Sequence, residues 1–121
     1  MTPSEYQTEV GRTEPKNDDV LYAALGETAT RRLLHASLGV STESGEFVDS
    51  VKRALFYGTK LDIGNVKEEL GDLLWYVSLA LSAIGSSFEE VMEENVRKLR
   101  RRYEDGFSRE AAVARADKEG G

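Results

Sequence analysis

Val66-Lys-Glu-Glu-Leu-Gly-Asp-Leu-Leu-Trp-Tyr-Val-Ser-Leu-Ala-Leu-Ser-Ala-Ile84 is the most apolar stretch of this 121-residue chain. Its apolar residues are too numerous for a single surface stripe, so it predicts the most buried helix of an all-α protein. Gly85 follows, a residue type that commonly ends helices. Glu69 and Asp72 interrupt the stretch three positions apart and share one helix face. Because Asp72 lies within the apolar segment, its carboxylate needs a cation or a basic partner there.

A second acidic pair, Glu43 and Glu46, lies in the preceding helical pattern, which runs from Thr28 as N-cap to about Phe56. Gly58 provides the stop, and Asp62 or Asn65 can cap the next helix after a connector over residues 59–64. Glycines at positions 39 and 45 suggest close approach of a neighbouring helix or of a ligand. The alternative is a break near residues 39–41 that divides the segment into two shorter helices.

The remaining segments predict shorter elements. Residues 1–20 read as a helical or irregular lead-in that Gly11 and Pro15 interrupt, followed by a brief helix over residues 20–25. Ser87 and Glu90 have the spacing of a capping box that opens a last helix through about Tyr103. We divide the chain into a lead-in (1–27), a helical domain (28–107) and a polar tail expected to be frayed or flexible (108–121).

Composition excludes several kinds of site. The chain has no cysteine and one histidine, His35, so thiolate chemistry and multi-histidine metal sites are ruled out. A net charge of −6 argues against a general nucleic-acid binder. No apolar run approaches the ~20 residues that cross a bilayer, and the N-terminus lacks a signal-peptide core, so we expect no membrane partner and a cytoplasmic location.

Spacing alone does not establish a metal site. Random placement of 22 acids among 121 residues produces about four pairs three positions apart. The chain has four such pairs, at 43/46, 46/49, 69/72 and 90/93. The residues alone therefore leave two interpretations open. The four carboxylates surround a hard divalent cation, or they are scattered surface acids.

Three ordered segments carry a family resemblance: Leu38-Gly-Val-Ser-Thr-Glu-Ser-Gly-Glu-Phe-Val-Asp-Ser-Val-Lys52, Glu68-Glu-Leu-Gly-Asp-Leu-Leu-Trp-Tyr76, and Asn95-Val-Arg-Lys-Leu-Arg-Arg-Arg-Tyr103 with Gly106-Phe107. Together they resemble the MazG-like all-α nucleotide pyrophosphohydrolases over about residues 28–107. The opening Glu5-Tyr-Gln, with Arg12-Thr13, resembles phage-type members.

This resemblance implies a four-helix-bundle protomer that assembles into a homodimer or homotetramer. It implies hydrolysis of nucleoside triphosphates, dNTPs or NTPs, to the monophosphate and pyrophosphate, for cleaning or remodelling of nucleotide pools. It also implies Mg²⁺ as cofactor, with Mn²⁺ able to substitute and more than one ion per site. A phage-encoded member would act in the host cytoplasm.

The resemblance also assigns residues. It makes Glu43, Glu46, Glu69 and Asp72 the metal ligands. One glutamate that faces the metal can take a proton from the attacking water; we choose Glu46 for this role, with Glu43 as the other catalytic carboxylate. Some members carry a further glutamate where this chain has Thr42. The expected substrate-binding residues are Asn95, Lys98, Arg102, Tyr103, Lys52 and Trp75.

Several of these residues can instead have a purely structural role. Arg97–Arg102 can simply complement the dipole of a helix C-terminus. Trp75 can be a core or interface residue, and His35 is expected to pack, or at best to contact a base. Two other functions stay open: hydrolysis of dUTP, dUDP or modified nucleotides within the same superfamily, and a non-catalytic helical interaction module with a structural cation site.

Overall fold

The computed structural model describes residues 1–118, and every regular element in this range is helical. The all-α class predicted from the sequence is therefore confirmed. In chain order the elements are α1 (Pro3–Thr13), α2 (Asp18–Leu25), α3 (Thr28–Phe56), α4 (Ile63–Ala83), α5 (Phe88–Arg102), α6 (Arg109–Ala114) and the 3-10 helix η1 (Ala116–Lys118).

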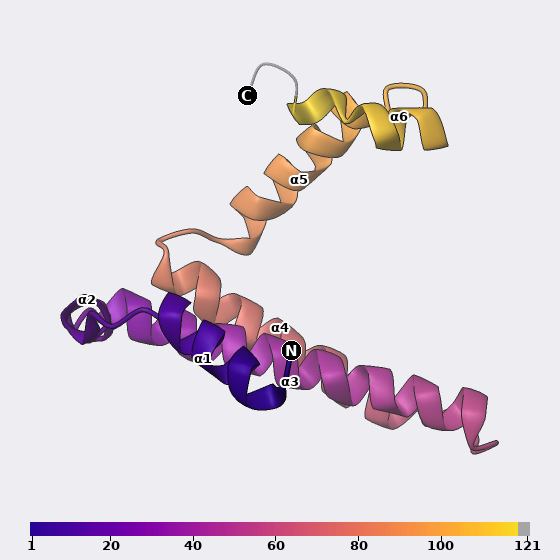
Figure 1. Cartoon of the computed structure of the whole chain (residues 1–121). Coiled ribbons are helices and arrows are strands. Elements are labelled where there is room, and N and C mark those ends of the chain that lie inside the picture. The colour runs from indigo at the N-terminus through magenta and orange to yellow at the C-terminus, as the bar shows by residue number, and fades with distance from the viewer. Residues whose placement is uncertain (119–121) are drawn as a thin grey trace.

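The two long helices α3 and α4 pack against each other as an antiparallel hairpin, which forms the centre of the molecule (Figure 1). Polar contacts join the helices at both ends. Arg32 Nη2 donates to Ser82 Oγ over 2.8 Å, and Asn65 Nδ2 donates to Ser50 Oγ over 2.7 Å. Between these contacts a Cβ on residue 39 would overlap the Tyr76 ring, so Gly39 permits the close packing of the two helices.

Helix α3 is continuous over 29 residues, so the alternative break near residues 39–41 is wrong. Its N-cap is Glu27 rather than Thr28, and no side chain caps its first turn. Asp62 caps α4 as anticipated, since its side chain accepts from the backbone N–H of Asn65 over 3.0 Å. Gly58 and Gly85 have positive φ angles of 70° and 71°, the left-handed backbone that glycine adopts most easily after a helix.

Helix α5 leaves the hairpin at an angle of 96° to α4 (Figure 1). Half of the expected capping box is present: Ser87 Oγ accepts from Glu90 N–H, but the Glu90 carboxylate accepts instead from Ser86 Oγ. Because α5 packs mainly with the C-terminal segment, one described chain does not close a four-helix bundle around the hairpin. No single helix within residues 1–118 is long and apolar enough to cross a membrane; α4 and α5 meet those criteria only as this bent pair.

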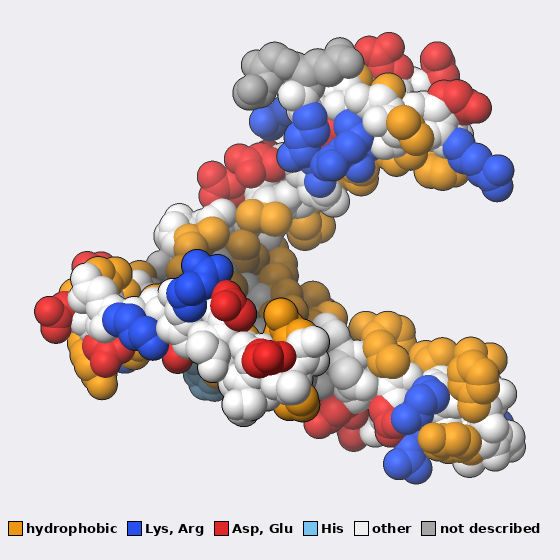
Figure 2. Space-filling model, in the orientation of Figure 1, with side chains coloured by type: hydrophobic (Ala, Val, Ile, Leu, Met, Phe, Trp, Pro, Cys, Tyr) orange, Lys and Arg blue, Asp and Glu red, His pale blue; other side chains and the backbone are white. Residues whose placement is uncertain are grey.

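Burial in α4 is much lower than its apolar sequence predicts. Its buried residues are Glu69 and Leu81, whereas Leu74 and Trp75 are 57% and 58% exposed. The expectation of a deeply buried helix is wrong for the single chain, because only one face of α4 meets α3. Hydrophobic side chains also cover the end of the hairpin near the α3–α4 connection, as Figure 2 shows; Leu55 there is 72% exposed.

The two ends of the chain are more regular than expected. Helix α1 continues through Gly11 to Thr13, supported by a complete capping box between Thr2 and Glu5. The tail, expected to be frayed or flexible, contains the short helices α6 and η1, and η1 packs against α5. The last part of that expectation, over residues 119–121, lies outside the described residues.

Candidate metal and substrate site

An acidic cluster spans the α3–α4 hairpin. One carboxylate oxygen from each of Glu43, Glu69 and Asp72 lies within 4.8 Å of the others. The i, i+3 spacing places Glu69 and Asp72 on one face of α4, and the antiparallel packing brings Glu43 of α3 opposite them. The hairpin thus joins acids that lie 26 or more positions apart in the sequence.

The buried acid of this cluster is Glu69, whereas the sequence predicted burial of Asp72. Asp72 is exposed, whereas Glu69 is 8% exposed, so the argument from an apolar environment applies to Glu69. The Oε2 atoms of Glu43 and Glu69 are buried and have no hydrogen-bond partner among the described residues. Buried carboxylate oxygens normally have a partner, so this pair needs a proton or a cation.

The fourth predicted ligand, Glu46, lies beside Glu69 and affects its protonation. Interaction with the Glu46 carboxylate, then burial, then interaction with Glu43 raise the pKa of Glu69 to about 7. Like charges held together make ionisation of one member unfavourable. The same crowding favours a divalent cation, because a cation stabilises all the ionised forms at once.

The donor set fits a hard divalent ion. It consists only of carboxylate oxygens, and two of them are buried and unpartnered on facing helices. Oxygen-only sets of this kind suit Mg²⁺, Mn²⁺ or Ca²⁺, whereas zinc sites are usually built from nitrogen and sulfur ligands. Glu43, Glu69 and Asp72 can hold the ion; Glu46, the fourth predicted ligand, is not part of this group of three and interacts with its member Glu69.

A hollow adjoins the acidic cluster along the same face of the hairpin. Glu46 and Glu69 line it on the acidic side, and Arg53 and Asn65 line it farther along the hairpin. The remaining lining residues are Thr42, Gly45, Asp49 and Ser50. A Cβ at Gly45 would meet no atom within 4 Å, so this glycine faces open space rather than a neighbouring helix.

Lys52, the substrate contact expected on α3, does not line this hollow. Its side chain borders a separate apolar groove with Val48 and Leu55, and its Nζ lies 5.6 Å from the centre of the Tyr57 ring. Arg53 lines the hollow instead. Helical geometry could have identified it: at about 100° per residue, Arg53 lies about 20° around the helix from Glu46, and Lys52 about 120° away.

The expected contacts on α5 are not brought to the acidic cluster within one chain. Asn95 and Lys98 are exposed on α5, which points away from the hairpin (Figure 1). Arg102 makes a bidentate ion pair with Asp117, through Nε at 2.6 Å and Nη2 at 2.9 Å. The Tyr103 ring packs against Phe107, with 5.4 Å between the ring centres.

Trp75 belongs to an aromatic cluster one turn after Asp72. Its ring meets the Tyr76 ring edge to face at 5.0 Å and lies 6.2 Å from the His35 ring. With 58% of its surface exposed, Trp75 is not a core residue of the single chain. Stacking with a base and contact with another subunit both remain compatible with this position.

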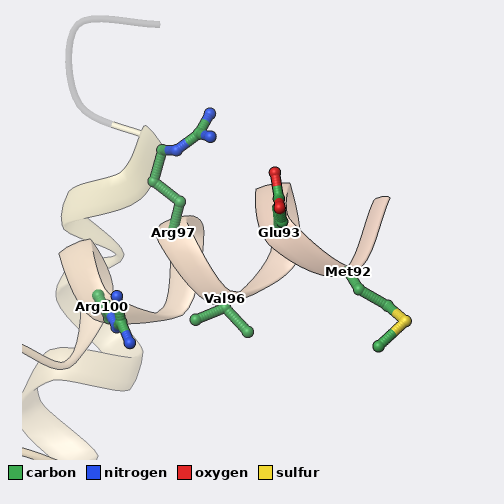
Figure 3. Close-up of a pocket in the computed structure, with 5 residues that line it drawn as sticks. All are labelled: Met92, Glu93, Val96, Arg97 and Arg100. Carbon is green, nitrogen blue, oxygen red and sulfur yellow. The ribbon is translucent and has the colours of Figure 1, made fainter. Parts of the chain in front are cut away.

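A second hollow lies on α5 itself, lined by Met92, Glu93, Val96, Arg97 and Arg100 (Figure 3). All five residues come from one helix, and Glu93 and Arg97 point to a different side from Val96 (Figure 3). The surface contains none of the expected ligands, so we place no site there.

Comparison with known proteins identifies the class. Residues 32–107 match the MazG nucleotide pyrophosphohydrolase domain, which covers more than half of the chain. The chain therefore belongs to the MazG nucleotide pyrophosphohydrolase family, as the sequence resemblance predicted. It is also similar to the gene 37 protein of Mycobacterium phage L5, with 26% identity over 95 residues that cover 74% of this chain and 83% of that protein. No solved structure matches the chain significantly.

Proposed function

We propose that this protein hydrolyses nucleoside triphosphates, dNTPs or NTPs, to the monophosphate and pyrophosphate with Mg²⁺ as cofactor. The observation that carries the proposal is the pair of buried, unpartnered carboxylate oxygens on Glu43 and Glu69, in a chain of the MazG family. Bound Mg²⁺ would neutralise phosphate charge and lower the pKa of an attacking water. Mn²⁺ would substitute, and four carboxylates have enough oxygens for more than one ion.

Different acidic residues of the chain would bind the cation and accept the proton. Glu43, Glu69 and Asp72 hold the cation between the two helices. Both Glu46 and Glu69 line the hollow, but Glu46 is exposed and Glu69 is buried, so Glu46 is the better placed to accept a proton from a water molecule. Thr42 is unsuited to this role, because a hydroxyl is far too weak a base near neutral pH; it donates to the backbone oxygen of Gly39 over 3.1 Å.

Substrate recognition would require a second copy of the chain. Asn95, Lys98, Arg102 and Tyr103 lie on or directly after α5, away from the acids of the same chain. The exposed apolar surface of the hairpin supports self-association into a dimer or tetramer, because an isolated chain would leave this surface in water. In the assembly Trp75 would stack with the base, and Arg102 would have to exchange Asp117 for phosphate.

Release of pyrophosphate from a panel of dNTPs and NTPs, with and without Mg²⁺, tests the activity. Glu46→Gln and Asp72→Asn should abolish turnover and leave the helical circular dichroism unchanged. Glu68→Gln is the matched control, because Glu68 is an exposed α4 acid outside both the cluster and the hollow. Full activity in the Glu46 and Asp72 variants would remove these residues from the site.

The same panel separates the alternatives. Turnover confined to dUTP, dUDP or modified nucleotides would narrow the substrate class within the superfamily. If no nucleotide is hydrolysed, the buried, unpartnered carboxylate oxygens of Glu43 and Glu69 instead favour a structural cation site in a non-catalytic helical module. Trp75 is the chain's single tryptophan, so a change in its fluorescence on adding nucleotide would report binding independently of turnover.

A further inference from the structure

The hollow beside the acidic cluster has two chemically different regions. Glu46 and Glu69 form the acidic region, while Arg53 and Asn65 contribute a cation and an amide farther along the hairpin. Glu46 and Arg53 are seven residues apart on α3, which corresponds to two turns and about 10 Å along the helix axis. The flexible arginine side chain can shorten this separation, so a chain of phosphates held through a cation at the acids is within reach of the guanidinium.

Arg53 already binds a carboxylate. Its Nε donates to Asp49 Oδ2 over 2.8 Å, while Asp49 Oδ1 also lies 3.4 Å from Lys52 Nζ. This contact ties the Arg53 side chain to Asp49 on the preceding turn of α3, and 62% of that side chain is exposed. A guanidinium has five N–H donors, and a single contact with Asp49 leaves others available for a second oxyanion.

The opposite helix supports the same part of the hollow. Asn65 lies on the first turn of α4, and its side chain donates to Ser50 Oγ, one turn before Arg53 on α3. This bond fixes Asn65 and Ser50 against each other and holds the two helices together beside Arg53. The positive charge of Arg53 therefore lies on a face of the hairpin that this hydrogen bond supports, and not on a loop.

We propose that Arg53 binds the phosphates that leave as pyrophosphate, and that Asp49 holds its guanidinium ready while no substrate is bound. This inference rests on the proposed function and adds a binding residue to the same site. The α-phosphate would lie at the cation that the carboxylates hold, beside Glu46. The β- and γ-phosphates lie toward Arg53, whose planar fork matches a pair of phosphate oxygens. Asp49 competes with phosphate for that fork.

The test uses inhibition by each product of the reaction. In Arg53→Gln, inorganic pyrophosphate should inhibit about tenfold more weakly, the scale of one lost charge-assisted contact, and the KM for the triphosphate should rise similarly. Inhibition by the nucleoside monophosphate should not change. Lys67→Gln is the charge-matched control, because Lys67 is exposed on α4 and does not line the hollow.

Asp49→Asn should change pyrophosphate inhibition in the opposite direction from Arg53→Gln. A variant that merely disturbed α3 would not strengthen inhibition. Freeing Arg53 from its carboxylate should strengthen inhibition by pyrophosphate severalfold. Equal pyrophosphate inhibition in Arg53→Gln and Lys67→Gln would overturn the proposal, as would weaker inhibition in Asp49→Asn. A larger loss in Lys52→Gln than in Arg53→Gln would also overturn it. The proposed function is judged separately, by pyrophosphate release from the unmodified chain.

Discussion

The ring of Tyr76 lies directly against Gly39, so closely that a side chain at residue 39 would overlap its atoms. This contact lies midway along the hairpin, between the Arg32–Ser82 and Ser50–Asn65 hydrogen bonds. It therefore helps to set the distance between α3 and α4 and, with it, the spacing of the carboxylates that the two helices contribute.

Gly39→Ala and Gly45→Ala should have opposite effects on stability. At residue 39 the added methyl group overlaps the Tyr76 ring, and such overpacking costs about 1–3 kcal/mol. At residue 45 the methyl group meets open space, so alanine should raise the free energy of unfolding by about 0.5–1 kcal/mol. Urea denaturation of both variants measures the difference. Equal effects would show that Gly39 does not determine the helix contact.

The cation-free protein should become less stable between pH 4.5 and pH 7. The pKa of Glu69 is raised from its usual 4.5 to about 7, chiefly by Glu46 and then by burial. The folded chain therefore binds a proton in this range that the unfolded chain has already released, and the free energy of unfolding falls as pH rises. Added Mg²⁺ should restore stability above pH 7, because the cation binds the ionised folded form.

Urea denaturation in EDTA across this pH range checks the expectation. Glu69→Gln should show a shallower decrease than the unmodified chain, and Glu68→Gln should follow the unmodified chain. If Glu69→Gln and Glu68→Gln have the same pH dependence, Glu69 does not bind the extra proton.

The C-terminal segment should detach in acid. The ion pair with Arg102 lowers the pKa of Asp117 from 3.8 to about 2. The folded chain thus favours the ionised form, so the contribution is present above pH 3.8 and is lost as pH falls toward 2. NMR amide shifts of residues 109–118 should change over this range. In Asp117→Asn the same residues should lose protection from hydrogen exchange at neutral pH, and Asp105→Asn should not have this effect.

The apolar groove on α3 should mediate self-association. Its lining residues are Phe47, Val48, Val51, Lys52, Leu55 and Phe56. Burying one leucine side chain contributes about 1.5–3 kcal/mol, so Leu55→Glu should weaken association at least about tenfold in analytical ultracentrifugation. Val113→Glu, on α6 and also highly exposed, is the control. Unchanged association of Leu55→Glu would place the subunit contact elsewhere on the hairpin.

Helix positions were largely predictable because their signals are local. Glycines at 58 and 85 adopt the left-handed backbone expected after helices α3 and α4, and Asp62 accepts the N-terminal hydrogen bond expected of a cap. The tail was less predictable, because the bidentate contact between Arg102 and Asp117 spans 15 residues and leaves no periodic trace in the sequence. Family membership followed from ordered motifs, and the match over residues 32–107 confirms it.

By itself, the sequence determined an all-helical chain of the MazG family and the acids available to a cation, because helix period, caps and motifs are properties of neighbouring residues. Tertiary structure alone decided which acid is buried: Glu69 faces α3, and Asp72 is exposed. It also brought Arg53 to the hollow and left Lys52 in the apolar groove. The physical reason is that burial and pairing depend on how two helix surfaces meet, and a single helix pattern does not specify that contact.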